Sequence, residues 1–156
     1  MIRDANPNDY KQIFEILKAE GMINSVSKKR FLNSFGKYHK GKEFRNLPYT
    51  SERWFVAENA EKVVGTSYCF WGSIYGYIGK VAVEKEYRRK RIGSDLMKKT
   101  IDFLKDQGVA SIHAVVRTGE EENLVFFERF GFKYHDLYLM DAKLDKRTMM
   151  KKRQQP

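Results

Sequence analysis

The chain has 156 residues, of which 42% are hydrophobic and 14% aromatic, so it is large enough to bury a core as one domain. Its three prolines and eleven glycines argue against a disordered chain, and no apolar run approaches the roughly 20 residues of a membrane-spanning helix. The net charge of +10 favours an anionic partner, and the single cysteine, Cys69, indicates a reducing, cytoplasmic setting.

The chain begins with a predicted strand and two predicted helices. Residues 2–5 are strand-like, and Asn8-Asp9 offers an N-cap for a helix with an apolar side that ends at Gly21. A second helix is expected over about 25–35. The basic stretch 37–45 is expected to be a loop.

Three strand-like runs follow and predict an antiparallel meander. The break Asn59-Ala-Glu-Lys62 has the length of a hairpin turn between the first two runs. The predicted strands are 54–58, 63–71 and 75–83.

Beyond Val83 the apolar spacing changes to that of a helix, which runs from Ile92 until Gly108. A strand at 110–116, a helix at 120–130 and a last strand at 132–141 complete the pattern. This order predicts an α/β (α+β) fold with a mixed, mostly antiparallel sheet of six or seven strands and about four flanking helices.

Half of the excess charge lies in the last fifteen residues, which hold six basic side chains and one acidic side chain, a net of +5. Such a run is usually a solvated tail, and it could also be an arm for nucleic acid. We therefore expect one domain over 1–142 and a basic tail over 143–156.

The turn between the strand 75–83 and the long helix is the clearest candidate site. A helix N-terminus presents unpaired backbone N–H groups, which together with the helix dipole favour a bound phosphate. Four cations lie in the same turn, namely Arg88, Arg89, Lys90 and Arg91. Their charges suit a pyrophosphate or the ribose phosphate of coenzyme A.

Two motifs carry a family resemblance. The segment from Val83 to Ser94 resembles the coenzyme-binding motif of the GNAT N-acetyltransferase superfamily, Gln/Arg-x-x-Gly-x-Gly/Ala, with Arg88 at its start and Gly93 at its end. The segment Phe126-Phe-Glu-Arg-Phe-Gly-Phe132 is similar to the second signature of that family. The resemblance extends from about Trp54 to Phe132 and implies a GNAT fold with a splay between strands 75–83 and 110–116.

The chain departs from the family pattern at three positions. Arg91 stands where the motif has its middle glycine, and Arg89 stands at another frequent glycine position, although glycine lets the backbone approach phosphate most closely. Phe127 replaces the tyrosine that commonly protonates the leaving thiolate, and phenylalanine cannot donate a proton.

The resemblance implies direct acetyl transfer from acetyl-CoA to a primary amine, without a metal. A backbone N–H, expected at Val81, would stabilise the oxyanion. The strand 75–83 lacks the carboxylate that often acts as base, which leaves Glu84 as a weak candidate beside water relays. Tyr134 is the corresponding candidate for the acid, with solvent as the alternative. Glu58, Glu86 and Tyr138 are further candidates for these two roles.

The resemblance also implies a set of coenzyme contacts, which come from the strand end, the turn, the first helical residues and the second signature. The expected residues are Val81, Ala82, Val83, Arg88, Arg89, Lys90, Arg91, Ile92, Gly93, Ser94, Asn123, Phe126 and Phe127. His39, His113 and His135 are too scattered to form a metal site.

The acceptor amine is left open between a small molecule and a protein. Aromatic residues crowd the segment 68–77, where they could bind an ammonium, form a homodimer interface or belong to the core. Two other functions remain open: a GNAT-like domain that binds acyl-CoA but catalyses poorly, and a basic nucleic-acid-binding protein. No membrane partner is expected.

Overall fold

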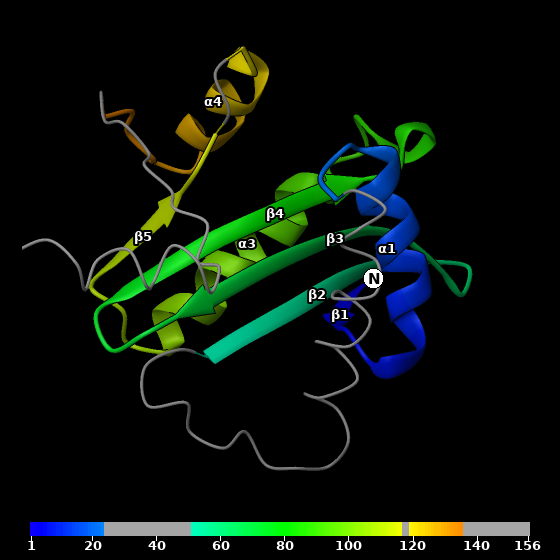
Figure 1. Ribbon diagram of the computed structural model, residues 1–156, viewed down its shortest axis with the longest axis horizontal. Coiled ribbons are helices and arrows are strands. Elements are labelled where there is room, and N and C mark those ends of the chain that lie inside the picture. Colours follow the sequence, from blue (N-terminus) through cyan, green and yellow to red (C-terminus); the bar gives the residue numbers. More distant parts are fainter. Residues whose placement is uncertain (24–50, 117–118, 136–156) are drawn as a thin grey trace, which may run out of the picture. The chain divides into compact units, whose positions relative to one another are not determined.

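The computed structural model describes residues 1–23, 51–116 and 119–135. The chain divides into two compact units, Met1–Arg117 and Thr118–Pro156. The first unit holds a sheet of five strands in the order β1-β2-β3-β4-β5 (Figure 1). The strands are β1 (Ile2–Asp4), β2 (Ser51–Asn59), β3 (Lys62–Trp71), β4 (Tyr75–Val83) and β5 (Ser111–Ala114).

The sheet is antiparallel from β1 to β4, and β5 is parallel to β4. The predicted meander is therefore confirmed. Its first hairpin has Ala60 and Glu61 at its tip, both with positive φ, which matches the turn geometry that fits the twist of two antiparallel strands.

Two helices cover opposite faces of this sheet. Helix α1 (Tyr10–Ala19) lies in front of the strands and α3 (Ile92–Asp106) lies behind them (Figure 1). Buried apolar residues of α1 pack against one face of the sheet, in a cluster of Tyr10, Ile13, Ile16, Leu17, Val56, Val63 and Ala82. The prediction of a mixed sheet with helices on its faces is confirmed, although the strand count is five among the described residues.

The N-cap of α1 is Asp9, within the predicted Asn8-Asp9, although the Asp9 side chain makes no capping hydrogen bond to this helix. A single 3-10 turn, Pro7–Asp9, precedes the helix, and Asn6 caps this turn by accepting a hydrogen bond from the Asn8 amide. Asp9 completes a capping box by accepting from the Asn6 amide at 2.7 Å. Pro7 suits the start of this turn, because its fixed φ is that of the first position after a cap.

A β-bulge divides β4 into two parts. Tyr68 pairs with Lys80, whereas Cys69 pairs with Ile78, so that Gly79 is an extra residue on β4. The bulge changes which side chains face α1: Tyr77 lies on that face before it, and Lys80 lies there after it.

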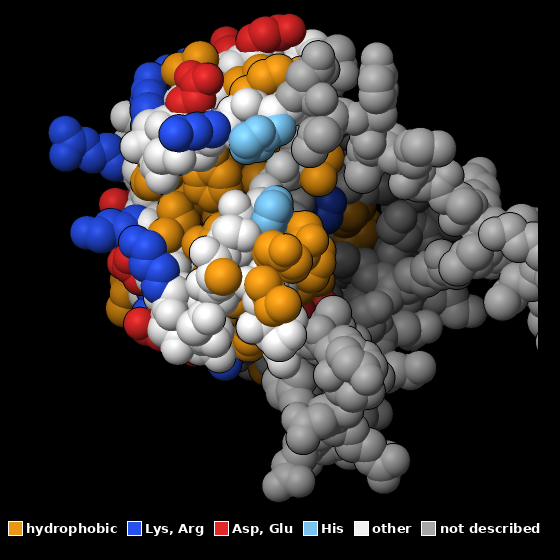
Figure 2. Space-filling view, turned by 90° about the vertical axis from the view of Figure 1, so that its left-hand side faces the viewer, with side chains coloured by type: hydrophobic (Ala, Val, Ile, Leu, Met, Phe, Trp, Pro, Cys, Tyr) orange, Lys and Arg blue, Asp and Glu red, His pale blue; other side chains and the backbone are white. Residues whose placement is uncertain are grey.

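The end of the sheet near the β3–β4 loop carries hydrophobic side chains on its surface (Figure 2). The exposed ones in the first unit include Ile74, Tyr75 and Val115. Strand β5 is also shorter than the predicted strand 110–116, since it ends at Ala114 and Val115 and Val116 lie beyond it.

The second unit contains helix α4 (Glu121–Glu128), shorter than the predicted 120–130. Gly131 follows it with φ of 84°, a conformation that glycine adopts without strain. Residues 132–135 are not in a strand, and 136–141 of the predicted last strand lie outside the described residues. So do the predicted helix at 25–35, the loop at 37–45 and the tail at 143–156.

Candidate functional site

The splay between β4 and β5 is present. Residues Tyr75 to Ile78 of β4 pair with Ser111 to Ala114, whereas β4 continues to Val83. In the part of the chain that the structure describes, residues 79–83 therefore have no strand on the β5 side. Figure 1 shows β5 leaving β4 at an angle.

Backbone groups of Val81 and Val83 face this open edge. The Glu84 amide donates to Val64 of β3 at 2.9 Å, and the direction of backbone groups alternates along a strand. The amides of Val83 and Val81 therefore point away from β3. An extended ligand could pair with them as a neighbouring strand would.

The predicted phosphate turn joins this edge to α3. Helix α3 begins at Ile92, and no side chain caps it. The first intrahelical bond runs from the Asp95 amide to the Arg91 carbonyl at 3.0 Å, which leaves the amides of Ile92, Gly93 and Ser94 without helical partners. These amides and the helix dipole form a site for an anion.

Arg89 and Arg91 adopt the backbone conformation that their glycine-like positions require. Their φ angles are 61° and 65°, in the left-handed region that costs an L-residue roughly 1–2 kcal/mol. The turn therefore retains its shape despite both substitutions. Neither side chain forms an ion pair with a described residue, so both charges remain available to an anion.

The other two cations of the turn have partners within the protein. Arg88 forms an ion pair with Glu20 at the end of α1, and its Nε donates to the Val83 carbonyl at 3.1 Å. Lys90 lies over the ring of Tyr87, with its Nζ 5.2 Å from the centroid. Arg88 thus fixes the turn to α1 and to the end of β4.

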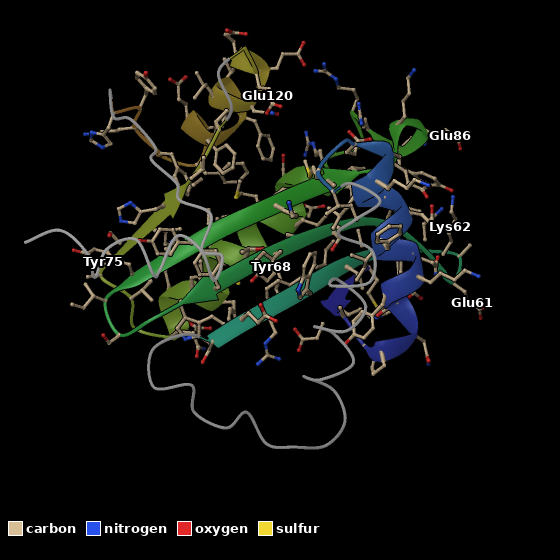
Figure 3. All side chains as sticks on the ribbon, viewed as in Figure 1. Glu61, Lys62, Tyr68, Tyr75, Glu86 and Glu120 are labelled. Atoms are coloured by element: carbon tan, nitrogen blue, oxygen red, sulfur yellow. The ribbon has the colours of Figure 1, made fainter. Side chains whose placement is uncertain are left out.

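The two ends of the sheet have different chemistry. Figure 3 shows Lys62 and Glu86 at the end near the turn, Tyr75 at the opposite end, and Tyr68 between them. The charged groups of the turn lie at the first end. Farther from the turn, the rings of Tyr68, Phe70 and Tyr77 contact one another, which distinguishes a charged end from an aromatic end.

The aromatic side chains form rows across the sheet. The middle row consists of Trp54, Tyr68 and Lys80, whose two rings are 4.4 Å apart. The Lys80 ammonium donates to the Met22 carbonyl at 3.1 Å. The outer row, which we call the ring row, runs from β2 to β5 through register partners and consists of Glu52, Phe70, Tyr77 and His113.

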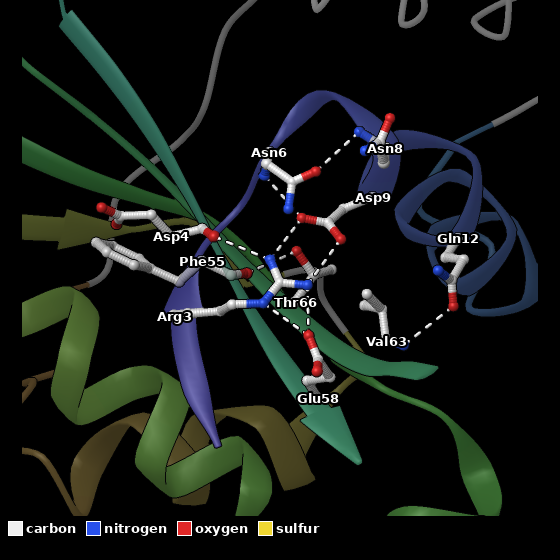
Figure 4. A network of polar contacts seen from close by, with 10 residues as sticks. All are labelled: Arg3, Asp4, Asn6, Asn8, Asp9, Gln12, Phe55, Glu58, Val63 and Thr66. Carbon is white, nitrogen blue, oxygen red and sulfur yellow. Dashed lines mark hydrogen bonds and ion pairs between the residues drawn. The ribbon is translucent and has the colours of Figure 1, made fainter. Parts of the chain in front are cut away.

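Two of the predicted carboxylates are engaged in ion pairs. Glu84 accepts from Lys62 at 2.6 Å, and this hydrogen bond raises the pKa of Lys62. Glu58 accepts from Nε of Arg3 at 2.7 Å (Figure 4). The same guanidinium binds the buried Asp9, so Glu58 belongs to a structural network.

Cys69 is fully buried in β3. Burial raises the pKa of its thiol to about 12, and a protonated thiol is a poor nucleophile. The position therefore suits packing better than a covalent acetyl intermediate.

The remaining predicted residues lie in the second unit. Asn123 donates from its side chain to Glu120 at 2.8 Å, next to the start of α4. Phe126 and Phe127 contact each other edge to face, with ring centroids 5.9 Å apart. Tyr134 is 68% exposed. The assignment of these four residues to the coenzyme or to catalysis stays a prediction.

The sequence analysis assigned no role to Glu52 and considered His113 only as a possible metal ligand. Glu52 accepts from the Tyr68 hydroxyl at 2.6 Å, and the His113 ring lies 5.4 Å from that of Tyr77. The sequence predicts which residues alternate between the two faces of each strand. It does not predict the bulge at Gly79, which aligns the four members of the ring row.

The sequence matches known acetyltransferases. The profile of the acetyltransferase (GNAT) family matches residues 13–132. N-alpha-acetyltransferase 30 of Schizosaccharomyces pombe is 31% identical over 90 residues, which are 54% of this chain and 60% of that protein. The chain thus spans less than two thirds of the length of this relative.

Solved structures share the fold over most of the chain. A transcriptional regulator from Bacillus halodurans C-125 has a TM-score of 0.70 at 24% identity, covering 91% of this chain and 99% of the other. Glucosamine-6-phosphate N-acetyltransferase from Arabidopsis thaliana has a TM-score of 0.71 at 20% identity, covering 91% and 97%. At these identities the likeness shows the fold alone.

No described helix is both long and apolar enough to cross a membrane. The described histidines, cysteine and carboxylates contain no group of three that could hold a metal ion.

Proposed function

Because this chain belongs to the acetyltransferase (GNAT) family, we propose that it transfers an acetyl group from acetyl-CoA directly to a primary amine. The observation that carries the proposal is the continuity between the open edge of β4 and the uncapped start of α3. One end of this surface offers amides to an anion, and the other offers amides to an extended chain. Acetyl-CoA contains both an anionic pyrophosphate and an extended pantetheine arm.

The described residues fit the coenzyme. The amides of Ile92, Gly93 and Ser94 would hold the pyrophosphate, and the guanidinium groups of Arg89 and Arg91 would add charge. These cations supplement the backbone at positions where other members of the family have glycine.

The open edge would hold the pantetheine arm. The amides of Val81 and Val83 would pair with it, and a fixed backbone N–H of Val81 would stabilise negative charge on the thioester oxygen. Such a donor is worth roughly 3 to 4 kcal/mol in comparable acyl transfer. Backbone atoms supply these contacts, so side chains of β4 are free to vary.

The acceptor that we propose to test first is the α-amine of a peptide. The support is the match to an N-alpha-acetyltransferase over more than half of this chain. The fold itself does not choose the acceptor, since acceptor sites differ between proteins of one fold.

The proposal is tested by calorimetry with acetyl-CoA, followed by measurement of free thiol released in the presence of peptides, lysine peptides, polyamines or aromatic amines. We expect saturable binding and acceptor-dependent thiol release. Absence of heat with acetyl-CoA and with longer acyl-CoAs would contradict the proposal. Tight binding without release by any acceptor would indicate a domain that binds the coenzyme without turnover.

A pair of variants tests the location of the site. Gly93→Asp places a carboxylate beside the expected phosphate, and we expect it to abolish acetyl-CoA binding. Gly72→Asp makes the same chemical change in the β3–β4 loop, at the other end of the sheet, and should leave binding intact. Unchanged affinity in Gly93→Asp would place the phosphates elsewhere.

A further inference from the structure

The open edge of β4 has a defined inner end. Pairing between β4 and β5 stops at Ile78 and Ala114, whereas the phosphate turn adjoins the other end of the edge, at Val83. A coenzyme that lies along residues 79–83 therefore directs its thioester toward Ile78. Because α3 packs behind the strands, an acceptor would approach this point over the α1 face of the sheet (Figure 1).

The ring row leads away from this point across the sheet. Tyr77, Phe70 and Glu52 are register partners on β4, β3 and β2. The rings of Phe70 and Tyr77 stack, with centroids 4.8 Å apart and an interplanar angle of 8°. Neighbouring strands lie about 4.8 Å apart, so Glu52 starts about 10 Å from Tyr77. An acceptor lying over the ring row would extend from the thioester to Glu52.

The Glu52 carboxylate forms no ion pair with a described residue. It accepts a hydrogen bond at 2.6 Å from the Tyr68 hydroxyl, which is a neutral partner. The neighbouring Arg53 lies on the opposite face, with its guanidinium 5.0 Å from the ring of Phe103 in α3, and pairs with Asp4. The negative charge of Glu52 is therefore available to a ligand.

The rings around this carboxylate suit a cation. Trp54 lies 4.4 Å from Tyr68, and Phe70 lies 5.9 Å from Tyr68 on its other side. Ring faces attract an ammonium or guanidinium group, and they also pack against the methylene stem that carries it. The Lys80 ammonium, in the middle row of the same face, donates to the Met22 carbonyl at 3.1 Å.

We propose that Glu52, together with the rings of Trp54 and Phe70, binds a second positive charge of the acceptor, about 10 Å from the amine that is acetylated. This inference rests on the proposed function and deepens it, because it names an acceptor with two cations. In a peptide the second cation is a lysine or arginine side chain at residue two. In a small molecule it is the far amine of a diamine. Glu52 selects the acceptor and takes no part in proton transfer.

The first test uses two peptides that differ only at residue two, which is lysine in one and norleucine in the other. Norleucine keeps an apolar stem and lacks the charge. At saturating acetyl-CoA, we expect kcat/KM to be about tenfold higher for the lysine peptide, from a partly exposed ion pair and a cation–π contact. The preference should shrink as the salt concentration rises.

A second series shows whether the acceptor is a small molecule. The two nitrogens of extended α,ω-diaminoheptane lie about 10 Å apart, and those of diaminopropane about 5 Å apart. We expect kcat/KM for the longer diamine to exceed that for heptylamine, beyond the statistical gain from two equivalent amines. The shorter diamine should show no such advantage over propylamine. A preference in either series supports the subsite and identifies the kind of acceptor.

Variants locate the subsite. Glu52→Gln keeps an acceptor for the Tyr68 hydroxyl and removes the charge, so the preference for lysine should fall to about threefold or less. Its kcat/KM with the norleucine peptide and its affinity for acetyl-CoA should not change. Glu61→Gln makes the same change at the hairpin that follows the far end of β2 and should keep the preference (Figure 3). Glu52→Lys should favour glutamate over norleucine at residue two.

The outcomes separate this inference from the function on which it rests. Absence of turnover by the unmodified protein with every acceptor overturns both. Turnover without a preference in either series overturns the inference alone, and so does a full preference in Glu52→Gln. An equal fall of kcat/KM for the lysine and norleucine peptides in Glu52→Gln, or loss of acetyl-CoA binding, would show a structural role and would also overturn it.

Discussion

Arg91 allows backbone strain and side-chain charge to be separated by two substitutions. Its φ of 65° penalises any residue with a Cβ, so Arg91→Ala keeps the strain and removes the charge, whereas Arg91→Gly removes both. Relief of roughly 1–2 kcal/mol of strain is offset by about 0.4–1 kcal/mol, because glycine gives the unfolded chain more freedom. We expect Arg91→Gly to be more stable than Arg91→Ala by about 0.5–1 kcal/mol.

Thermal unfolding measures this difference. At this chain length it corresponds to a Tm higher by about 1–4 °C for Arg91→Gly than for Arg91→Ala. The same pair of substitutions at Lys90, which does not have a positive φ, is the control and should favour alanine. Equal or lower stability of Arg91→Gly would refute the left-handed conformation of residue 91.

The charge is measured separately by acetyl-CoA binding. An exposed ion pair contributes about 0.2–1 kcal/mol, so both Arg91 variants should bind more weakly by up to about fivefold and with a smaller dependence on salt. Because the two variants lack the same charge, their affinities should agree. Affinity equal to that of the unmodified protein in both would mean that the guanidinium does not reach a phosphate.

Three further predictions concern the fold. Arg3→Met removes the cation that pairs with the buried Asp9 carboxylate and should lower the free energy of unfolding, measured in urea, by about 3 kcal/mol. Burial raises the pKa of Asp9, but hydrogen bonds from Arg3 and Asn6 lower it overall. The stability that the unmodified protein gains from the ionised Asp9 should therefore be lost as pH falls below the ordinary value of 3.8. Gly79→Ala should destabilise by about 1–3 kcal/mol, because a Cβ would lie 2.8 Å from Tyr68. Cys69 should resist alkylation at pH 8 until urea unfolds the chain, as mass spectrometry would show.

Local chemistry explains which elements were predictable. The hairpin at residues 59–62 and the helix from Ile92 follow from spacing and turn length, which act within a few residues. The 3-10 turn before α1, with its cap at Asn6, was not predicted, since several polar residues surround Pro7 and any of them could cap a helix. Choosing among them requires knowing where Arg3 of β1 binds Asp9, a tertiary contact.

The open edge of β4 and the free amides at the start of α3 were predictable for a related reason. Its groups are consecutive backbone amides at a strand end and a helix start, so one stretch of sequence contains them. The ring row comes from four strands, and its alignment depends on the bulge at Gly79. A shift of one residue in any strand would turn its side chain to the opposite face. The sequence could therefore identify the aromatic residues but not which of them lie side by side on neighbouring strands.

Packing behind the sheet sets the distance between the two sets of amides. A Cβ at Gly65 would lie 3.1 Å from Leu96 and 3.3 Å from Ile92, so the missing side chain lets α3 approach β3 closely. Thr100 and Ser67 join the same two elements by a buried hydrogen bond of 2.8 Å. These contacts fix the start of α3 relative to β4 without touching either binding surface. A core substitution that moves α3 along the sheet would consequently separate the phosphate amides from those of the open edge, even with every predicted contact residue retained.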